Sequence, residues 1–106
     1  MFSFSAIDPR ATPVLTINMV QVLPSGVTVA SATASVLLAN GADPNASALT
    51  GTVDSSGGGT APFPVKIQWK AGGLPGRIYI VSAICVGSDG ETYVGSGLLP
   101  IVNGGA

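Results

Sequence analysis

The stretch of residues 64–97 constrains the fold of this chain most, because its hydrophobic residues repeat with the period of a β-strand. At its start, in PVKIQW, apolar side chains alternate with polar ones, which is typical of a strand that buries one face. Residues 78–85 are apolar at nearly every position, so we expect a central strand that is covered on both faces. Asp89-Gly90 favours a tight hairpin turn before residues 92–97. The stretch therefore predicts three antiparallel strands.

The rest of the chain shows further strand patterns and no amphipathic helical period of useful length. Loops rich in Gly, Asn, Ser and Pro separate the strands at residues 39–45 and 55–62. We count about seven strands, which predicts an all-β chain and an antiparallel β-sandwich of the immunoglobulin-like (fibronectin type III-like) kind, with a barrel as the alternative. The expected strands outside the first stretch cover residues 14–22, 27–38 and 47–54, with residues 98–102 continuing or ending the last strand.

The chain length predicts one domain, and residues that interrupt strands mark its two ends. A chain of 106 residues is long enough to bury a modest core. Asp8-Pro9 and Thr12-Pro13 break regular structure, so we interpret residues 1–13 as an N-terminal arm or an edge strand. The sandwich is expected over residues 14–102, and residues 103–106 are expected to form a short tail.

Charged residues make up only 8% of the chain, against about a quarter in an average soluble domain. The net charge is −1, and such a surface has little charge repulsion, so we expect multiple copies or a homo-oligomer. Four basic residues among five acidic ones cannot form the positive surface that nucleic acid requires. The sequence also has no run of about 20 apolar residues for a membrane span and no secretory leader pattern, which predicts synthesis in the cytoplasm.

Side chains suited to catalysis or metal binding are scarce. The chain has no histidine, which removes the commonest general base and the usual zinc ligand. Its single cysteine, Cys85, lies in an apolar strand pattern and is expected to be a buried structural thiol. Asp54, Asp89 and Glu91 would be the ligands of a calcium ion, but they lack the spacing of an EF-hand loop. We therefore expect no catalytic residue, no metal, no cofactor and no enzyme activity.

Residues 69–81 read WKAGGLPGRIYIV, and this run resembles the W-x-x-G-G-x-x-G-x-x-Y-x-V core of small bacteriophage fibre–tail adaptor-type proteins. Asp8-Pro9 and the strand pattern after it are similar to the opening of that family, although Val27-Thr28-Val29 replaces its Gly-Asp-x-Ile and Met19 stands near the position of a common Trp. Residues 40–62 match no part of the family pattern. The resemblance implies an immunoglobulin-like protein of a bacteriophage virion.

The residues of this run also have structural explanations that do not depend on the resemblance. Trp69 ends an alternating strand and should pack between the sheets as a large apolar side chain. Tyr79 is placed to hydrogen-bond back to the corner before its strand, as in a tyrosine corner. Glycine lets the chain cross between sheets where side chains would clash, and this is the expected role of Gly72, Gly73 and Gly76.

The low charge and the resemblance together predict a non-enzymatic structural protein of a virion, made in the host cytoplasm. It would be a capsid decoration or cement protein, or a neck or tail adaptor, that fastens neighbouring subunits such as the major capsid protein or neck and tail proteins. Phe2 and Phe4 in the arm, and Phe63 after the second loop, are the candidate partner contacts. The alternative is an immunoglobulin-like recognition module that binds carbohydrate or a host surface through these aromatics and Tyr93.

Overall fold

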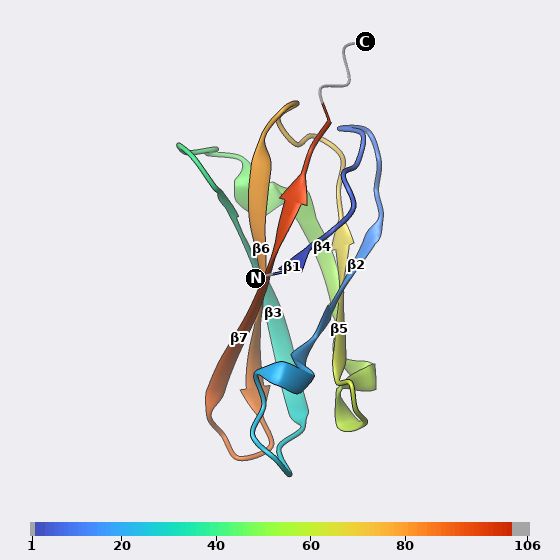
Figure 1. Cartoon of the computed structure of the whole chain (residues 1–106), viewed down its shortest axis with the longest axis vertical. Helices are drawn as coiled ribbons and strands as arrows, with labels where there is room; N and C mark the ends of the chain where they lie inside the picture. Colours follow the sequence, from blue (N-terminus) through green and yellow to red (C-terminus); the bar gives the residue numbers. More distant parts are fainter. Residues whose placement is uncertain (1, 103–106) are drawn as a thin grey trace.

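The computed structural model describes residues 2–102, and Figure 1 shows them as two β-sheets packed against each other. One sheet has the strand order β1-β7-β6-β3 and the other has the order β2-β5-β4. Neighbouring strands are antiparallel except β1 and β7, which are parallel. The chain is therefore all-β, as predicted, and its two layers are consistent with a β-sandwich. The strands are β1 (Phe2–Ser3), β2 (Val14–Asn18), β3 (Val29–Leu38), β4 (Thr50–Asp54), β5 (Pro64–Trp69), β6 (Ile78–Gly87) and β7 (Thr92–Pro100).

The two sheets share one core, built from side chains that alternate inward along their strands. In β5 the predicted alternation is confirmed, because Val65, Ile67 and Trp69 are fully buried while the residues between them are not. The odd-numbered residues of β6 point into the same core. Among them Cys85 has a buried thiol, as predicted, and burial raises its pKa. One continuous core therefore holds both layers together.

The sheets approach each other closely at Gly95 in β7. A Cβ atom there would lie 2.7 Å from the sulfur of Met19, so the missing side chain leaves the space that Met19 occupies. Met19 is fully buried because the strand predicted over residues 14–22 ends at Asn18 and continues as a 3₁₀ turn, η1 (Met19–Gln21). The boundary prediction was wrong because this turn directs a large apolar side chain into the core.

Two further 3₁₀ turns change the predicted boundaries. The turn η2 (Ala46–Leu49) replaces the first half of the strand predicted over residues 47–54 and buries its first and last residues, so β4 begins only at Thr50. A turn of this kind brings residues three apart to one side, which strand alternation cannot do. The turn η3 (Ser56–Gly59) lies within the loop predicted over residues 55–62, and β3 begins two residues later than predicted.

Residues 2–7 run along the four-stranded sheet, whereas the carbonyl oxygens of Pro9 and Pro13 accept hydrogen bonds from the backbone of Gly72 and of Trp69 in β5. β1 pairs with residues 97–98 of β7. Beyond β1, the backbone N–H of Phe4 donates to the carbonyl oxygen of Leu98 (2.8 Å), and that of Ile7 donates to the carbonyl oxygen of Pro100 (3.1 Å). These bonds attach the N-terminal segment to the upper half of β7. The predicted tail at residues 103–106 lies outside the described residues.

Candidate interaction surface

Tyr79 stands at the corner between β5 and β6 and ties three segments together. Its hydroxyl accepts a hydrogen bond from the backbone N–H of Leu74 (2.9 Å) and donates one to Oδ2 of Asp43 (2.8 Å). Its ring meets the ring of Trp69 edge-to-face, with centroids 5.6 Å apart. Burial raises the pKa of Tyr79, which keeps the hydroxyl protonated and able to donate. The corner therefore holds the loop that contains Asp43 against the sheet.

The three glycines predicted to shape this corner lie beside it. Gly72 and Gly76 have φ angles of +124° and +73°, which residues with side chains rarely adopt. A Cβ atom on Gly73 would lie 3.2 Å from the side chain of Ile101, so glycine permits close packing at this position. Trp69 is fully buried, and its Nε1 has no hydrogen-bond partner within the described residues. The role of Trp69 in this arrangement is to stabilise the fold, because it has no surface that another protein could contact.

The aromatic side chains predicted to contact a partner pack partly against the core, as far as the structure describes them. Phe4 and Phe63 are half-buried and pack against the core, and Phe63 does so with a φ of +57°, which is rare for a bulky residue. The side chain of Phe2 lies outside the described part of the structure. Tyr93 also packs against the core, and its hydroxyl donates a hydrogen bond to Oδ2 of Asp89 (2.6 Å). The contacts of Phe4, Phe63 and Tyr93 are therefore made, at least in part, inside the domain.

A surface that the sequence analysis did not identify lies on the second side of β6. This strand is central, as predicted, with β7 and β3 beside it. However, Ile78 is 43% exposed and Val86 is 40% exposed, and the even-numbered residues between them are half-buried. The expectation that β6 is covered on both faces is therefore wrong for the described chain. The apolar pattern of β6 predicted that both of its faces are covered, but the rest of the described chain covers only one of them.

We define the outer face as the outward-pointing side chains of β3, β6 and β7. Strand register places Thr33, Ile84 and Val94 in one row across these three strands. None of the side chains of the outer face is charged, although Leu37 is 63% exposed and Val94 is 51% exposed. The face consists of Ser31, Thr33, Ser35 and Leu37 from β3, of Ile78, Ile80, Ser82, Ile84 and Val86 from β6, and of Thr92, Val94, Ser96, Leu98 and Pro100 from β7.

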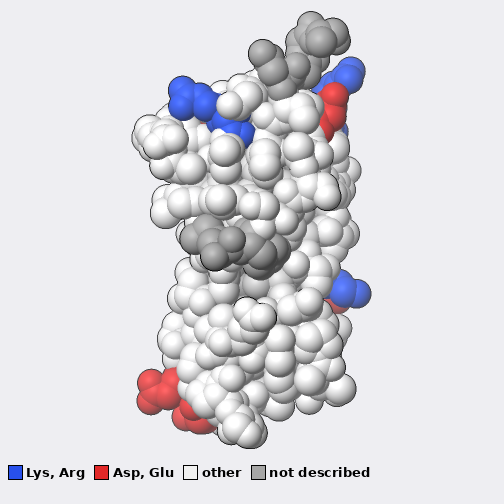
Figure 2. Space-filling model, in the orientation of Figure 1, with Lys and Arg blue, Asp and Glu red and all other residues white. Residues whose placement is uncertain are grey.

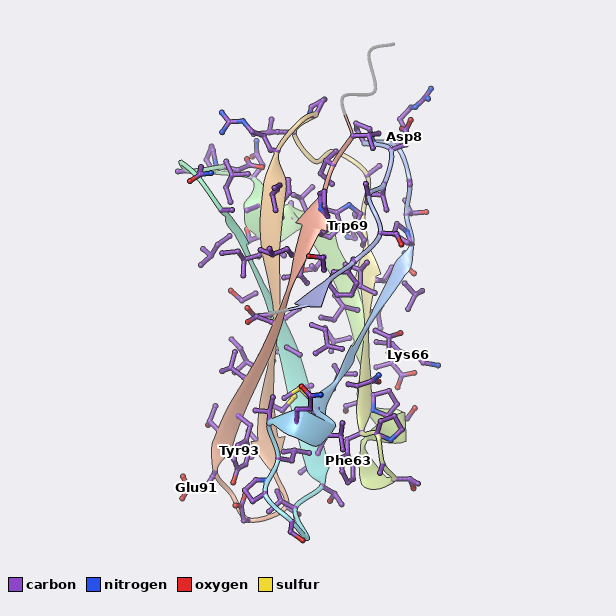
Figure 3. All side chains as sticks on the ribbon, viewed as in Figure 1. Asp8, Phe63, Lys66, Trp69, Glu91 and Tyr93 are labelled. Carbon is purple, nitrogen blue, oxygen red and sulfur yellow. The ribbon has the colours of Figure 1, made fainter. Side chains whose placement is uncertain are left out.

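The outward side of the three-stranded sheet has a different character. Strand register places Asp54 of β4 beside Lys66 of β5, and Val14 of β2 beside Gln68. Figure 3 shows Lys66 directed away from the molecule. Hydrogen bonds from Ser56 lower the pKa of Asp54, and Lys66 lowers it further. In the view of Figure 2, the charged side chains gather at the two ends of the molecule and on one flank.

Other kinds of site find no support in residues 2–102. These residues contain no group of three His, Cys, Asp or Glu side chains placed to hold a metal ion, so Asp54, Asp89 and Glu91 do not form the calcium site considered above. No helix in the same part of the chain is long and apolar enough to cross a membrane. Comparison of the chain with protein-family models, with curated proteins and with solved structures finds no match in any of the three.

Proposed function

We propose that this protein is a non-enzymatic structural protein of a bacteriophage virion, and that it fastens neighbouring subunits through its outer face. The observation that carries the proposal is that this exposed sheet surface has no charge. The water-facing side of an antiparallel sheet normally carries polar residues. Charged residues are instead depleted at the centres of protein–protein interfaces. Cover by a second protein explains why β6 is apolar on both sides.

We also propose that the sandwich is immunoglobulin-like. The orders β2-β5-β4 and β7-β6-β3 correspond to strands B-E-D and G-F-C of that fold. The hydroxyl of Tyr79 bonds to the backbone five residues upstream, which is the geometry of a tyrosine corner. Both features support an immunoglobulin-like fold, which the resemblance of residues 69–81 to the adaptor-type virion proteins also implies.

The size of the outer face suits a modest contact that is repeated many times. Strands of nine and ten residues, at about 3.3 Å per residue and about 4.8 Å apart, form a surface of roughly 14 by 30 Å. Covering it buries about 840 Å² over both partners, which is below the roughly 1,000 Å² of a specific interface and corresponds to a weak contact. Attachment of many copies to one particle strengthens such a contact through avidity. This favours a decoration or cement protein on the major capsid protein slightly over a neck or tail adaptor.

Two exposed valines, one on each sheet, provide a matched test of the proposal. Val94 on the outer face is 51% exposed, and Val14 on the three-stranded sheet is 56% exposed. We expect Val94→Lys to lose binding to purified virions in co-sedimentation, because a charge buried in an interface without a partner is costly. Val14→Lys should bind like the unmodified protein. Equal binding by both variants would contradict a role for the outer face.

The copy number then separates the two positions in the virion. Quantitative mass spectrometry of purified particles should find hundreds of copies of a capsid cement protein but only one small ring of a neck or tail adaptor. Absence of the protein from purified particles would overturn the virion assignment itself.

The recognition-module alternative has less support, because Phe4, Phe63 and Tyr93 pack against the core. A glycan array with the whole chain tests it directly. Saturable glycan binding that persists in Val94→Lys would favour the alternative over binding through the outer face.

A further inference from the structure

The outer face itself has no charge, but a charged side chain stands at each of its two ends. The central strand β6 begins directly after Arg77 and leads into the hairpin that contains Glu91, and both side chains are exposed. The ten residues of β6, at about 3.3 Å each, separate these ends by roughly 33 Å. In Figure 2 the left-hand flank, which is that of β3, β6 and β7 in Figure 1, shows basic side chains at its upper end and acidic side chains at its lower end.

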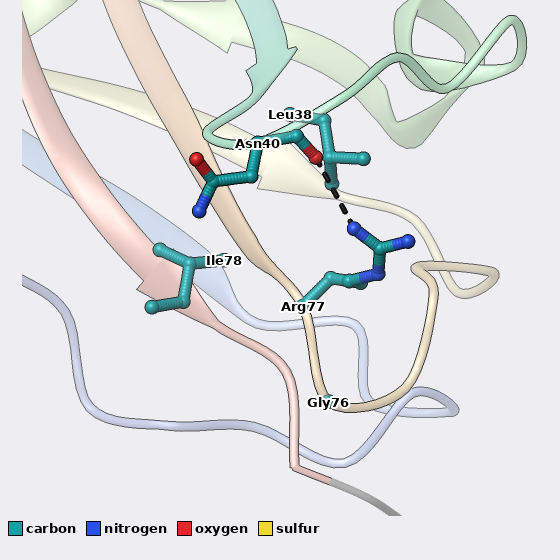
Figure 4. Close-up of a pocket in the computed structure, with 5 residues that line it drawn as sticks. All are labelled: Leu38, Asn40, Gly76, Arg77 and Ile78. Atoms are coloured by element: carbon teal, nitrogen blue, oxygen red, sulfur yellow. Dashed lines mark hydrogen bonds between the residues drawn. The ribbon is translucent and has the colours of Figure 1, made fainter.

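Arg77 borders the outer face at a small pocket beside Ile78 (Figure 4). The pocket measures about 100 Å³, and its lining is completed by Leu38, Asn40 and Gly76. Nη1 of Arg77 donates a hydrogen bond to the carbonyl oxygen of Asn40 (3.2 Å), which holds the guanidinium in place. The other side-chain N–H groups of Arg77 have no acceptor in the described part of the chain. The pocket is large enough for several water molecules or for the carboxylate end of one side chain.

Neither of these two charges is neutralised within residues 2–102. The only salt bridge among those residues joins Arg10 to Asp8. In the lower hairpin the carboxylate of Asp89 already accepts hydrogen bonds from the hydroxyl of Tyr93 and the backbone N–H of Glu91. The carboxylate of Glu91 accepts none, and Figure 3 shows this residue at the lower end of the molecule. The charges at both ends of the outer face are therefore free to pair with another protein.

The two charges lie at diagonally opposite corners of the outer face. β3 and β7 flank β6 on opposite sides. Arg77 is hydrogen-bonded to the loop that follows β3, whereas Glu91 directly precedes β7. A partner that is turned by 180° on the face therefore exchanges the groups that it presents to the two corners.

We propose that the protein covering the outer face places a carboxylate in the pocket beside Arg77 and a basic side chain opposite Glu91. This inference rests on the proposed function and specifies the chemistry of the partner, which is an apolar surface with an acidic group at one end and a basic group at the other. Charges at the rim of an interface speed association and fix orientation more than they add affinity. Turning the partner by 180° brings like charges together at both corners, which is costly. The two charges therefore select one orientation of the partner.

The first test reverses one of two positive charges at the same end of the molecule. We expect Arg77→Glu to raise the dissociation constant for purified virions at least about tenfold in co-sedimentation, because it sets two carboxylates side by side. Lys70 provides the matched control, since it is exposed and has no salt bridge within the described residues. Its side chain lies over β4 of the other sheet, where its Cε would be 3.0 Å from a Cβ atom on Gly51. Lys70→Glu makes the same change in net charge and should bind like the unmodified protein.

Two milder substitutions separate the charge of Arg77 from its hydrogen bond to Asn40. Arg77→Gln can still donate to that carbonyl oxygen but has no charge, and it should weaken virion binding by roughly two- to fivefold. Arg77→Lys keeps the charge and should bind more tightly than Arg77→Gln. Both differences should shrink at an ionic strength of about 1 M, where charges are screened within about 3 Å. Circular dichroism and chemical denaturation check that every variant folds.

Glu91→Lys tests the opposite corner and should also weaken binding. In the double variant Arg77→Glu/Glu91→Lys the two losses should multiply, because the groups that these residues meet on the partner lie far apart. Recovery of binding in the double variant, together with a concentration-dependent dimer in sedimentation velocity, would overturn the inference in favour of a second copy of the chain.

The same set of variants separates this inference from the proposed function. Loss of virion binding in Val94→Lys, with normal binding by Arg77→Glu and Glu91→Lys, overturns the inference and leaves the role of the outer face intact. Absence of binding by the unmodified chain overturns both. Loss in Arg77→Glu but not in Lys70→Glu supports the inference. Equal loss in those two variants would indicate general attraction between the molecule and the virion surface, and would also overturn it.

Discussion

The outward sides of the two sheets differ in a way that their inward sides do not. Both sheets contribute buried apolar residues to one core. Outward, the short three-stranded sheet presents Lys66, Gln68 and Asp54, as expected of a surface that faces water. The longer strands of the other sheet present no charge. The inward faces therefore explain how the chain folds, whereas the residues on the outward faces indicate which surface is suited to binding a partner.

The largest loss of stability is expected from a substitution in the core between the two sheets, and it should affect both sheets equally. Trp69 is fully buried in contact with Tyr79. We expect Trp69→Ala to lower the free energy of unfolding by about 3–5 kcal/mol, because it leaves a large cavity. Chemical denaturation measures this loss. Hydrogen exchange in the same variant should be faster in β3 and β5 alike, and protection retained in one sheet only would break the picture of a shared core.

A smaller effect is expected at the corner that supports the end of the four-stranded sheet. Tyr79→Phe removes the hydrogen bonds to Leu74 and Asp43, and it should cost about 1–3 kcal/mol because both partners lose a bond at a half-buried site. Thermal or chemical unfolding provides the measurement. Tyr93→Phe removes one exposed hydrogen bond to Asp89 and serves as the control with a smaller loss. Equal losses in the two variants would mean that the corner has no special role.

Outward-pointing side chains of both sheets should contribute little to the free energy of folding. A pair of variants, one on each sheet, can therefore compare the binding of the two surfaces at equal stability. Val94→Lys and Val14→Lys should each change the free energy of unfolding by no more than about 0.5 kcal/mol, because both side chains are more than half exposed. The two variants should therefore be equal in stability and unequal in virion binding. If Val94→Lys instead unfolds the protein, the outer face is needed for stability, and its lack of charge would not indicate a binding surface.

The smallest effect is expected from pH at the hairpin of the four-stranded sheet. The hydrogen bond from Tyr93 lowers the pKa of Asp89, and the Asp89 carboxylate raises the pKa of Tyr93 to about 12. Stability from Asp89 is present above its pKa in the unfolded chain and is lost as the pH falls through the lowered value. Stability from Tyr93 is present below the ordinary tyrosine pKa and is lost as the pH rises toward about 12.

Denaturation at a series of pH values measures both losses, with Tyr93→Phe as the reference. The variant should lose less stability than the unmodified protein at alkaline pH. At acid pH its loss should be smaller but not absent, because the backbone of Glu91 still donates to Asp89. An unchanged alkaline profile would show that the Tyr93 hydroxyl does not contribute.

Strand periodicity predicted the all-β fold because alternation reports directly which residues are buried. It placed β5 correctly and identified β6 as central. It could not identify the turns η1 and η2, where apolar residues enter the core without alternating. Nor could it identify the outer face, because an apolar strand has the same sequence whether its cover comes from its own chain or from another protein. Phe4 and Phe63 stay predicted partner contacts, but the sequence could not show that both also pack in part against the core of their own domain.

A row of hydroxyl groups crosses the middle of the outer face. Register places Ser35, Ser82 and Ser96 side by side, and the hydroxyl oxygens of Ser82 and Ser96 are 2.7 Å apart. In this pair one hydroxyl donates to the other, so one hydrogen bond stays within the sheet when water leaves, but the proton of the accepting hydroxyl is left without an acceptor. A protein that docks on this face therefore needs a hydrogen-bond acceptor opposite the serine row, while its contacts on either side are apolar. The serine row would thus fix the position of a partner on a face that is otherwise uniform.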